Sequence, residues 1–215
     1  MTNLSVTSYP AAQPRGALLV FAHGAGAGQR HPFMVAVASG LAGRGIDVVT
    51  FNFPYMAEKR KVPDKAPVLE AAFLEAIASS TGDACVAPTA QPRRLFIGGK
   101  SMGGRMATHL AAHGLDGLHG VIALGYPLHP PGRPDQPRTA HLPSIAVPVL
   151  IVQGGRDTFG TPSELKPVIE TMRAPVTLHV VEGGDHSLAV RGRKPDDTRA
   201  PVLDTIAEWM LEIGD

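Results

Sequence analysis

The chain has 215 residues, of which 44% are hydrophobic and 18% are charged, a composition typical of a globular protein that can bury its own core. Its 20 basic and 19 acidic residues leave a net charge of +1 without any long basic block, so nucleic acid is not an expected partner. The single cysteine, Cys85, excludes a disulfide framework and a cysteine-based zinc site. The longest apolar run, residues 16–22, is too short to span a bilayer, and only Arg15 precedes it, which argues against a signal peptide. We therefore expect a single domain over residues 1–215 that is cytoplasmic and binds no membrane, and we assign no oligomeric state.

Short apolar runs alternate along the chain with segments of helical periodicity. The runs are continuous rather than alternately apolar and polar, as in strands that are buried on both faces of a sheet. Strands that alternate with helices predict an α/β fold with a mostly parallel central sheet and helices on both faces. The expected elements are, in chain order, a strand over 17–22, a helix over 32–43, a strand over 47–51, a helix over 66–79, a strand over 95–98, a helix over 102–113, strands over 121–124 and 147–152, a helix over 162–173, a strand over 176–181 and a helix over 198–213.

Two proline-containing segments carry further expectations. Residues 127–146 contain six prolines and no helical period, so we interpret them as a long ordered loop. In the last helix, Val202, Ile206 and Trp209 fall on one face, and Pro201 is expected in the first turn.

In parallel sheets of this kind, ligands bind at the carboxyl ends of the strands. The segment Gly99-Lys100-Ser101-Met102-Gly103 is a G-x-S-x-G motif between a predicted strand and a predicted helix. A serine in such a tight turn has a strained backbone and points its hydroxyl outward, and side chains at Gly99 and Gly103 would crowd the turn. We identify Ser101 as the candidate nucleophile, with an ordinary glycine-rich connection as the alternative.

Two phosphate-binding interpretations of the glycine-rich segments fail on spacing. Gly99-Lys100-Ser101 resembles the end of a P-loop, but the first glycine of that motif would fall at Arg94. The segment that begins with Gly24 resembles a dinucleotide-binding loop, but its third glycine would fall at Gln29.

The first predicted strand ends in a glycine-rich loop, His23-Gly24-Ala25-Gly26-Ala27-Gly28. Such a loop lets backbone N–H groups point at one spot without obstruction by side chains. A serine esterase needs two donors for the oxyanion, and we expect them to be the N–H groups of Met102 and Ala25. The alternative is a flexible turn, and His23 is interpreted as a brace for the loop rather than as a base.

Two more strand ends carry catalytic residue types, each next to a glycine pair. Asp157 follows the predicted strand 147–152, and His186 follows the strand 176–181. The chain order Ser101, Asp157, His186 is that of the Ser-Asp-His triad of α/β-hydrolases. In these roles His186 takes the proton of Ser101 and later protonates the leaving group, and Asp157 fixes the imidazole tautomer. Asp185 is a rival acid, but its position next to His186 makes pairing with that ring awkward.

Four further side chains are candidates for substrate contact. Lys100 and Arg105 flank the elbow, where a cation attracts an acidic substrate, although exposed cations usually lie in water. Tyr55 and Tyr126 each follow a strand and are expected either to line the pocket or to pack over its rim. We expect no metal site, because no zinc-protease motif is present.

Together these motifs make the chain resemble the α/β-hydrolase superfamily over nearly its whole length, from His23 through the elbow and Gly125-Tyr126-Pro127 to His186. More narrowly, the chain is similar to the small lidless group related to dienelactone hydrolases. That group includes a testis-expressed hydrolase-like protein and a subunit of a chromatin acetyltransferase complex. The resemblance implies a Ser-His-Asp triad and no dissociable cofactor. Dienelactone hydrolases proper have a cysteine where this chain has Ser101, and many family members have a helical cap where it has the loop 127–146.

We therefore expect a serine hydrolase of the carboxylesterase or thioesterase kind, which acts on a small-molecule ester or thioester through an acyl-enzyme. A site without a cap is expected to be open, which favours short acyl esters or an exposed substrate over a buried lipid. Two alternatives stay open at this point. One is a non-catalytic binding or scaffold module on the same fold, and the other is an acyltransferase or peptidase that uses the same triad.

Overall fold

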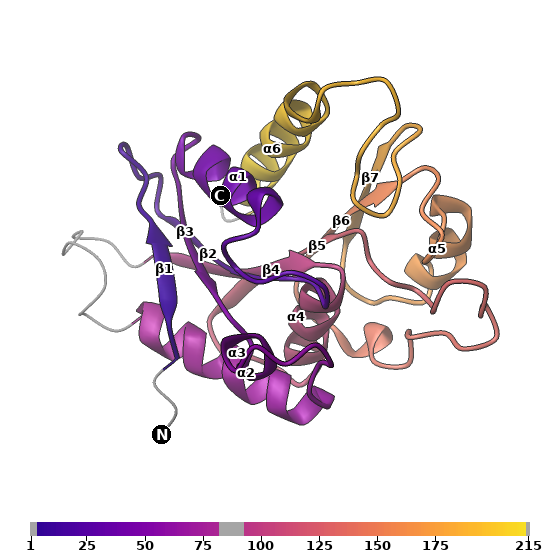
Figure 1. Cartoon of the computed structure of the whole chain (residues 1–215), viewed down its shortest axis with the longest axis horizontal. Helices are drawn as coiled ribbons and strands as arrows, with labels where there is room; N and C mark the ends of the chain where they lie inside the picture. The colour runs from indigo at the N-terminus through magenta and orange to yellow at the C-terminus, as the bar shows by residue number, and fades with distance from the viewer. Residues whose placement is uncertain (1–3, 82–92, 214–215) are drawn as a thin grey trace.

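The computed structural model describes residues 4–81 and 93–213, so Cys85 lies outside the described residues. A seven-stranded sheet with the order β1-β3-β2-β4-β5-β6-β7 runs through the centre of the molecule (Figure 1). All neighbouring strands are parallel except β1 and β3, which pair antiparallel at one edge. The strands are β1 (Val6–Tyr9), β2 (Ala17–Ala22), β3 (Ile46–Phe51), β4 (Arg94–Lys100), β5 (Leu118–Leu124), β6 (Val149–Gly154) and β7 (Val176–Val181).

The six strands that the apolar runs predict are all present, with ends displaced by a few residues. The sequence pattern did not predict β1. This short strand contains the polar residues Thr7 and Ser8, and it lies at the edge of the sheet, where a strand is only partly buried and so has no continuous apolar run. Strands β2 and β3 are buried along their whole length, as predicted. The expectation of burial on both faces is wrong for β7, which forms the opposite edge and is only partly buried.

Helices cover both faces of the sheet, as the alternation of elements predicts (Figure 1). Helices α1 and α6 pack on one face over side chains such as Leu19 and Phe21. Helices α3 and α4 pack on the other face over Val20 and Ile97. Among the described residues, we find no helix whose length and apolar character would let it cross a membrane. The helices are α1 (Pro32–Ala42), α2 (Pro54–Ala57), α3 (Ala66–Thr81), α4 (Met102–Ala112), the 3₁₀ helix η1 (Leu142–Ser144), α5 (Pro162–Ile169) and α6 (Pro195–Glu212).

The prediction that Pro201 lies in the first turn of the last helix is wrong, because α6 begins at Pro195. Pro195 has no N–H to leave unpaired at the helix start, and Asp196 and Asp197 place negative charge in the first turn, where it stabilises the helix dipole. Pro201 therefore lies inside α6, where it cannot donate the N–H of a regular helical turn. The helix after β6 is also shorter than predicted, since α5 ends at Ile169.

The proline-rich segment after β5 is an ordered loop, as expected. The hydroxyl of Tyr126 donates a hydrogen bond to the carbonyl oxygen of Arg138 (2.6 Å), and the N–H of Arg138 donates one to that of Leu128 (2.8 Å). Within residues 127–146, all of which are described, η1 is the only helix. No cap therefore covers the carboxyl ends of the strands on this side.

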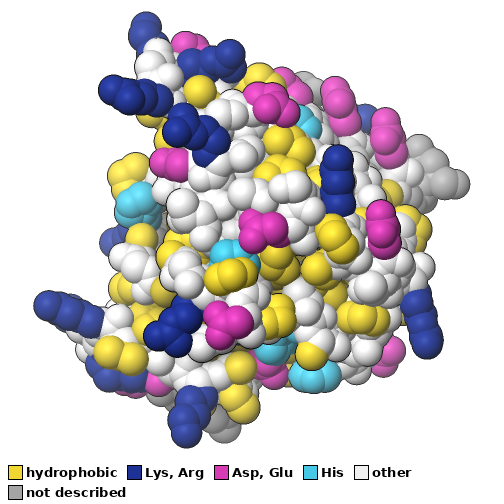
Figure 2. Space-filling view, turned by 90° about the vertical axis from the view of Figure 1, so that its right-hand side faces the viewer, with side chains coloured by type: hydrophobic (Ala, Val, Ile, Leu, Met, Phe, Trp, Pro, Cys, Tyr) yellow, Lys and Arg dark blue, Asp and Glu magenta, His cyan; other side chains and the backbone are white. Residues whose placement is uncertain are grey.

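Charged side chains of both signs lie on the surface. On the face shown in Figure 2, basic side chains stand mainly at the left-hand corners of the view, with acidic and apolar side chains between them. Arg44 donates to Asp204 at 2.7 Å and so connects the turn after α1 to α6. Because Asp204 is largely exposed, this pair contributes no more than about 1 kcal/mol to stability.

Candidate active site

Ser101 stands in a strained turn between β4 and α4, at the centre of the sheet. Its backbone has φ 51° and ψ −114°, a conformation that residues with a side chain rarely adopt. A side chain at Gly99 would come within 2.6 Å of the carbonyl oxygen of Ala22, and one at Gly103 would collide with the same oxygen. The turn is thus as strained as the motif predicts, and the close approach of β2 leaves no room for a side chain at either flanking glycine.

The hydroxyl of Ser101 and the side chains of His186 and Asp157 form one chain of hydrogen bonds. The Nε2 atom of His186 lies 2.9 Å from Oγ of Ser101, and its Nδ1 atom lies 2.8 and 3.0 Å from the two carboxylate oxygens of Asp157. Since a carboxylate only accepts, Nδ1 carries the proton and Nε2 is free to accept from the serine hydroxyl. The ring of Phe159 stacks on the imidazole with centroids 4.0 Å apart, which fixes the plane of the ring.

Asp157 is held in a buried network that the sequence did not reveal. Its carboxylate accepts hydrogen bonds from the N–H of Phe159 (2.8 Å) and from the side-chain amide of Gln153 (2.9 Å). Gln153 is fully buried, also donates to the carbonyl oxygen of Gly160 (2.7 Å) and accepts from the N–H of Tyr126 (2.8 Å). The sequence contains one hint of this role, namely that Gln153 is a polar residue at the end of an otherwise apolar strand. The network links the loops after β5 and β6 and orients the carboxylate.

The rival acid Asp185 has a different contact set. Its Oδ1 atom accepts hydrogen bonds from the N–H groups of Ser187 (2.8 Å) and Ala189 (3.0 Å) and thereby closes the turn that carries His186. The imidazole pairs with Asp157 instead. A side chain at Gly154 would collide with the carbonyl oxygen of Asp185, so the end of β6 and this turn are pressed together.

The loop after β2 is braced from below by His23 and Tyr55. His23 is fully buried, and its Nδ1–H donates to the carbonyl oxygen of Gly24 (2.7 Å) while Nε2 accepts from the N–H of Phe53 (3.0 Å). Burial lowers the pKa of His23, so the ring stays neutral in this role. The hydroxyl of Tyr55 donates to the carbonyl oxygen of Ala25 (3.0 Å), and burial raises the pKa of Tyr55 to about 12. The N–H of Ala25 has no acceptor among the described residues.

Neither of the two tyrosines that were candidates for substrate contact lines the cavity beside Ser101. Tyr55 packs beneath the loop that borders this cavity, and Tyr126 is buried with its hydroxyl on Arg138. Arg105, on α4, is partly exposed and is also absent from the cavity lining. Tyr55 and Tyr126 are buried in the apolar core, whereas Arg105 lies on α4 one turn beyond Ser101.

Lys100 does line the cavity, but its ammonium group is engaged by the protein. Its ammonium group donates a hydrogen bond to the backbone carbonyl oxygen of His186 at 2.5 Å. Burial lowers the pKa of Lys100 to about 8, against the attraction of Asp157 and Asp185. Gly125 makes room for this contact, because a side chain there would come within 2.8 Å of both the ammonium nitrogen and that carbonyl oxygen.

The cavity beside Ser101, which we call the Ser101 cavity, has a volume of about 390 Å³. Its walls come from the loop after β2, the start of α1, the elbow and the loops after β6 and β7. No group of acidic, histidine or cysteine side chains suited to a metal ion occurs among the described residues. The lining residues are Gly24, Ala25, Gly26, Ala27, His31, Phe33, Met34, Lys100, Ser101, Phe159, His186 and Ser187.

Comparison with known proteins gives one family and many solved structures of similar fold. A family model described as alpha/beta hydrolase domain matches residues 15–213. A dienelactone hydrolase from Anabaena variabilis superposes with a TM-score of 0.72 at 21% identity, covering 98% of this chain and 97% of that one. Est1E from Butyrivibrio proteoclasticus with bound ferulic acid has a TM-score of 0.73 at 15% identity, with 99% and 96% coverage. A monoacylglycerol lipase from Paleococcus ferrophilus has a TM-score of 0.71 at 16% identity, with 98% and 99% coverage.

Proposed function

Because the chain belongs to the alpha/beta hydrolase family, we propose that it is a serine hydrolase that cleaves a carboxylic ester or thioester of a small or exposed substrate. The observation that carries the proposal is the continuous hydrogen-bonded chain from Asp157 through His186 to a strained Ser101. A strained backbone that the surrounding structure maintains is a feature of functional sites. Solved relatives of the same fold named as esterase, lipase and dienelactone hydrolase add support for ester chemistry.

The reaction proceeds through an acyl-enzyme. His186 accepts the proton of Ser101 at Nε2 while Oγ bonds to the carbonyl carbon of the substrate. The tetrahedral intermediate collapses as His186 delivers that proton to the leaving oxygen or sulfur, which departs as an alcohol or thiol. Water then attacks the acyl group with His186 as base, and the acid is released with the proton returned to Ser101. Asp157 remains ionised, holds the imidazole tautomer and stabilises its charged form.

The developing oxyanion needs hydrogen-bond donors that are already in place. We assign the N–H groups of Ala25 and Met102 to this role. The N–H of Met102 belongs to the first turn of α4, where backbone donors lack helical partners. The N–H of Ala25, which has no acceptor in the described part of the chain, lies in a loop that His23 and Tyr55 hold in place. No metal or dissociable cofactor enters this proposal, and the single cysteine suits a cytoplasmic location.

Hydrolysis of short-chain nitrophenyl esters and of the matching thioesters tests the function. We expect Ser101→Ala to lower kcat by a factor on the order of 10⁴ to 10⁶. Ser79→Ala is the matched control, because Ser79 is an exposed serine on α3 whose hydroxyl donates to the carbonyl oxygen of Glu75 in its own helix. Equal turnover by wild type and Ser101→Ala would exclude the proposal.

A further inference from the structure

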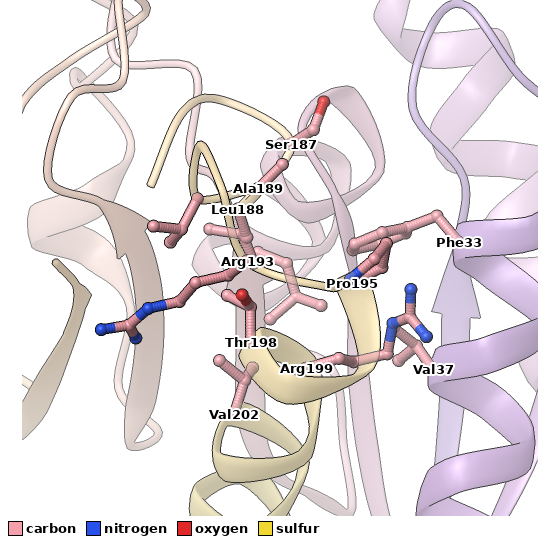
Figure 3. Close-up of a pocket in the computed structure, with 12 residues that line it drawn as sticks. Phe33, Val37, Ser187, Leu188, Ala189, Arg193, Pro195, Thr198, Arg199 and Val202 are labelled. Carbon is pink, nitrogen blue, oxygen red and sulfur yellow. The ribbon is translucent and has the colours of Figure 1, made fainter. Parts of the chain in front are cut away.

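A second cavity of about 190 Å³ lies between the start of α1, the loop after β7 and the first turns of α6 (Figure 3). Its walls are mainly apolar, and they include Val37 of α1, Leu188 and Val190 of the loop, and Val202 of α6. For scale, an engineered protein cavity of about 150 Å³ binds benzene. The second cavity therefore has the size and character to hold a small ring or a short branched hydrocarbon.

The second cavity adjoins the Ser101 cavity directly. Phe33 and Ser187 line both cavities, so these two side chains form the boundary that the cavities share. Ser187 is the residue after His186, whose Nε2 atom is the proton donor to the leaving group. The second cavity therefore lies beside the loop that carries the imidazole, the group that protonates the leaving group in the proposed reaction.

The wall that the loop after β7 contributes is built by the same turn that presents His186. Asp185 closes this turn through its side chain, and its N–H donates to the carbonyl oxygen of Ala189 (3.0 Å). Gly184 and Val190 form an isolated antiparallel bridge across its base. Leu188 sits at φ 63°, a strained conformation for a leucine, and is buried. The turn holds the imidazole and the cavity wall in one rigid unit.

The polar groups around the cavity are few. Thr198, on the first turns of α6, is buried, and its hydroxyl has no hydrogen-bond partner among the described residues. Its Oγ1 atom has almost no accessible surface, so Thr198 borders the cavity without offering a polar contact to an occupant. Arg193 and Arg199 also line the cavity, and Arg199 is paired with the exposed Asp196 (2.7 Å). The apolar walls, rather than these arginines, disfavour a cationic occupant, because an apolar surrounding offers a charge no partner.

We propose that the second cavity is a subsite for the leaving-group portion of the ester, and that it selects a neutral alcohol with a small ring or a branched hydrocarbon. This assignment rests on the proposed function, because it defines the leaving group relative to Ser101 and His186. It predicts selectivity in acylation, the step that expels the alcohol. Deacylation is independent of it, because the alcohol has already left.

The test compares benzyl acetate with methyl acetate on wild type and on Ala189→Phe. The turn that carries His186 uses only the backbone N–H and carbonyl of Ala189, whose side chain is exposed on the rim of the cavity, so a phenyl group there occupies the rim while those hydrogen bonds persist. We expect the variant to lower kcat/KM for benzyl acetate about tenfold or more, with little effect on methyl acetate and on breakdown of the shared acetyl-enzyme. Ala78→Phe, at an exposed position of α3, is the matched control and changes neither ester. An equal loss on both esters, or a change confined to deacylation, would overturn the subsite.

Charge and binding give two independent readouts. Acetylcholine is expected to be a poorer substrate than its neutral carbon isostere, 3,3-dimethylbutyl acetate, and the reverse order would contradict the selection of a neutral alcohol by the apolar walls. Binding of benzyl alcohol, followed by NMR, requires no turnover. Saturable binding of benzyl alcohol to wild type, abolished by Ala189→Phe, would support the subsite. This holds even if folded wild type hydrolyses no ester, and in that case only the proposed function fails. Absence of benzyl alcohol binding to folded wild type would overturn the subsite.

Discussion

The ammonium group of Lys100 donates a hydrogen bond to the backbone carbonyl oxygen of His186, so the residue that precedes the elbow serine holds the loop that carries the imidazole. The two residues belong to different strand ends, β4 and β7, which are separated in the sheet by β5 and β6. The contact therefore fixes the distance across the site between Ser101 and the ring that accepts its proton.

Removal of this contact is expected to lower turnover more than substrate binding. Lys100→Met keeps the length of the side chain but donates no hydrogen bond, so the imidazole loses part of its alignment with Ser101. We expect kcat to fall about tenfold, the effect of roughly 1.4 kcal/mol in the barrier, with little change in KM. Steady-state kinetics on the best ester measure the split, and Lys61→Met, at an exposed lysine, is the control. A change in KM alone would indicate substrate contact instead.

Lys100 also gives the stability of the protein a defined pH dependence. Burial lowers the pKa of Lys100 from 10.5 to about 8, so between these values the unfolded chain binds a proton that the folded chain does not. Stability rises with pH wherever the unfolded state binds more protons. We expect the free energy of unfolding of wild type, relative to Lys100→Met, to rise between about pH 8 and pH 10.5. Denaturant titrations at several pH values test this, and a relative decrease over that range would contradict the burial of the ammonium group.

The hydroxyl of Tyr55 is expected to matter for catalysis although it lies outside the cavity. Tyr55→Phe leaves the carbonyl oxygen of Ala25 without its donor and loosens the loop that presents the oxyanion-binding N–H. We expect a loss of about 1 kcal/mol in stability together with a several-fold drop in kcat. Tyr126→Phe is the matched control, since it removes a similar hydrogen bond to Arg138 and is expected to lower stability alone. Equal kcat values for the two variants would refute the bracing role of Tyr55.

Replacement of Asp157 and of Asp185 by asparagine is expected to have different effects on kcat. Asp157→Asn is expected to lower kcat by a factor on the order of 10⁴, because the amide no longer holds the required imidazole tautomer. Asp185→Asn retains an oxygen that accepts from Ser187 and Ala189, so the turn persists and kcat changes little. Both variants are measured on the same ester at the same pH. A larger loss for Asp185→Asn would reassign the acid.

The sequence predicts that the three candidate catalytic residues lie together, because each of them directly follows a buried strand. Ser101, Asp157 and His186 each follow an apolar run and neighbour glycines, and the parallel sheet brings such ends together. The glycine requirement at the elbow also followed from the motif, and the contacts with Ala22 explain it.

Contacts across the sheet were not accessible from sequence. The bonds of Lys100 to the His186 loop and of Tyr126 to Gln153 join residues from different strand ends whose side-chain directions no local pattern encodes. The same limit applied to Tyr55, whose position after a strand suggested a pocket wall but whose ring is buried beneath the loop. Strand β1 was missed for a physical reason of another kind, since an edge strand needs no apolar run.

The most direct test of the central assignment is the reaction of the folded protein with a fluorophosphonate probe, read by intact mass. The probe bonds only to a serine whose hydroxyl is activated, so it reports on the chain from Asp157 to Ser101 without knowledge of the substrate. We expect a single adduct on wild type and on Ser79→Ala, and none on Ser101→Ala. Folded wild type that takes up no probe, or an adduct that persists in Ser101→Ala, would contradict the assignment of Ser101 as the nucleophile.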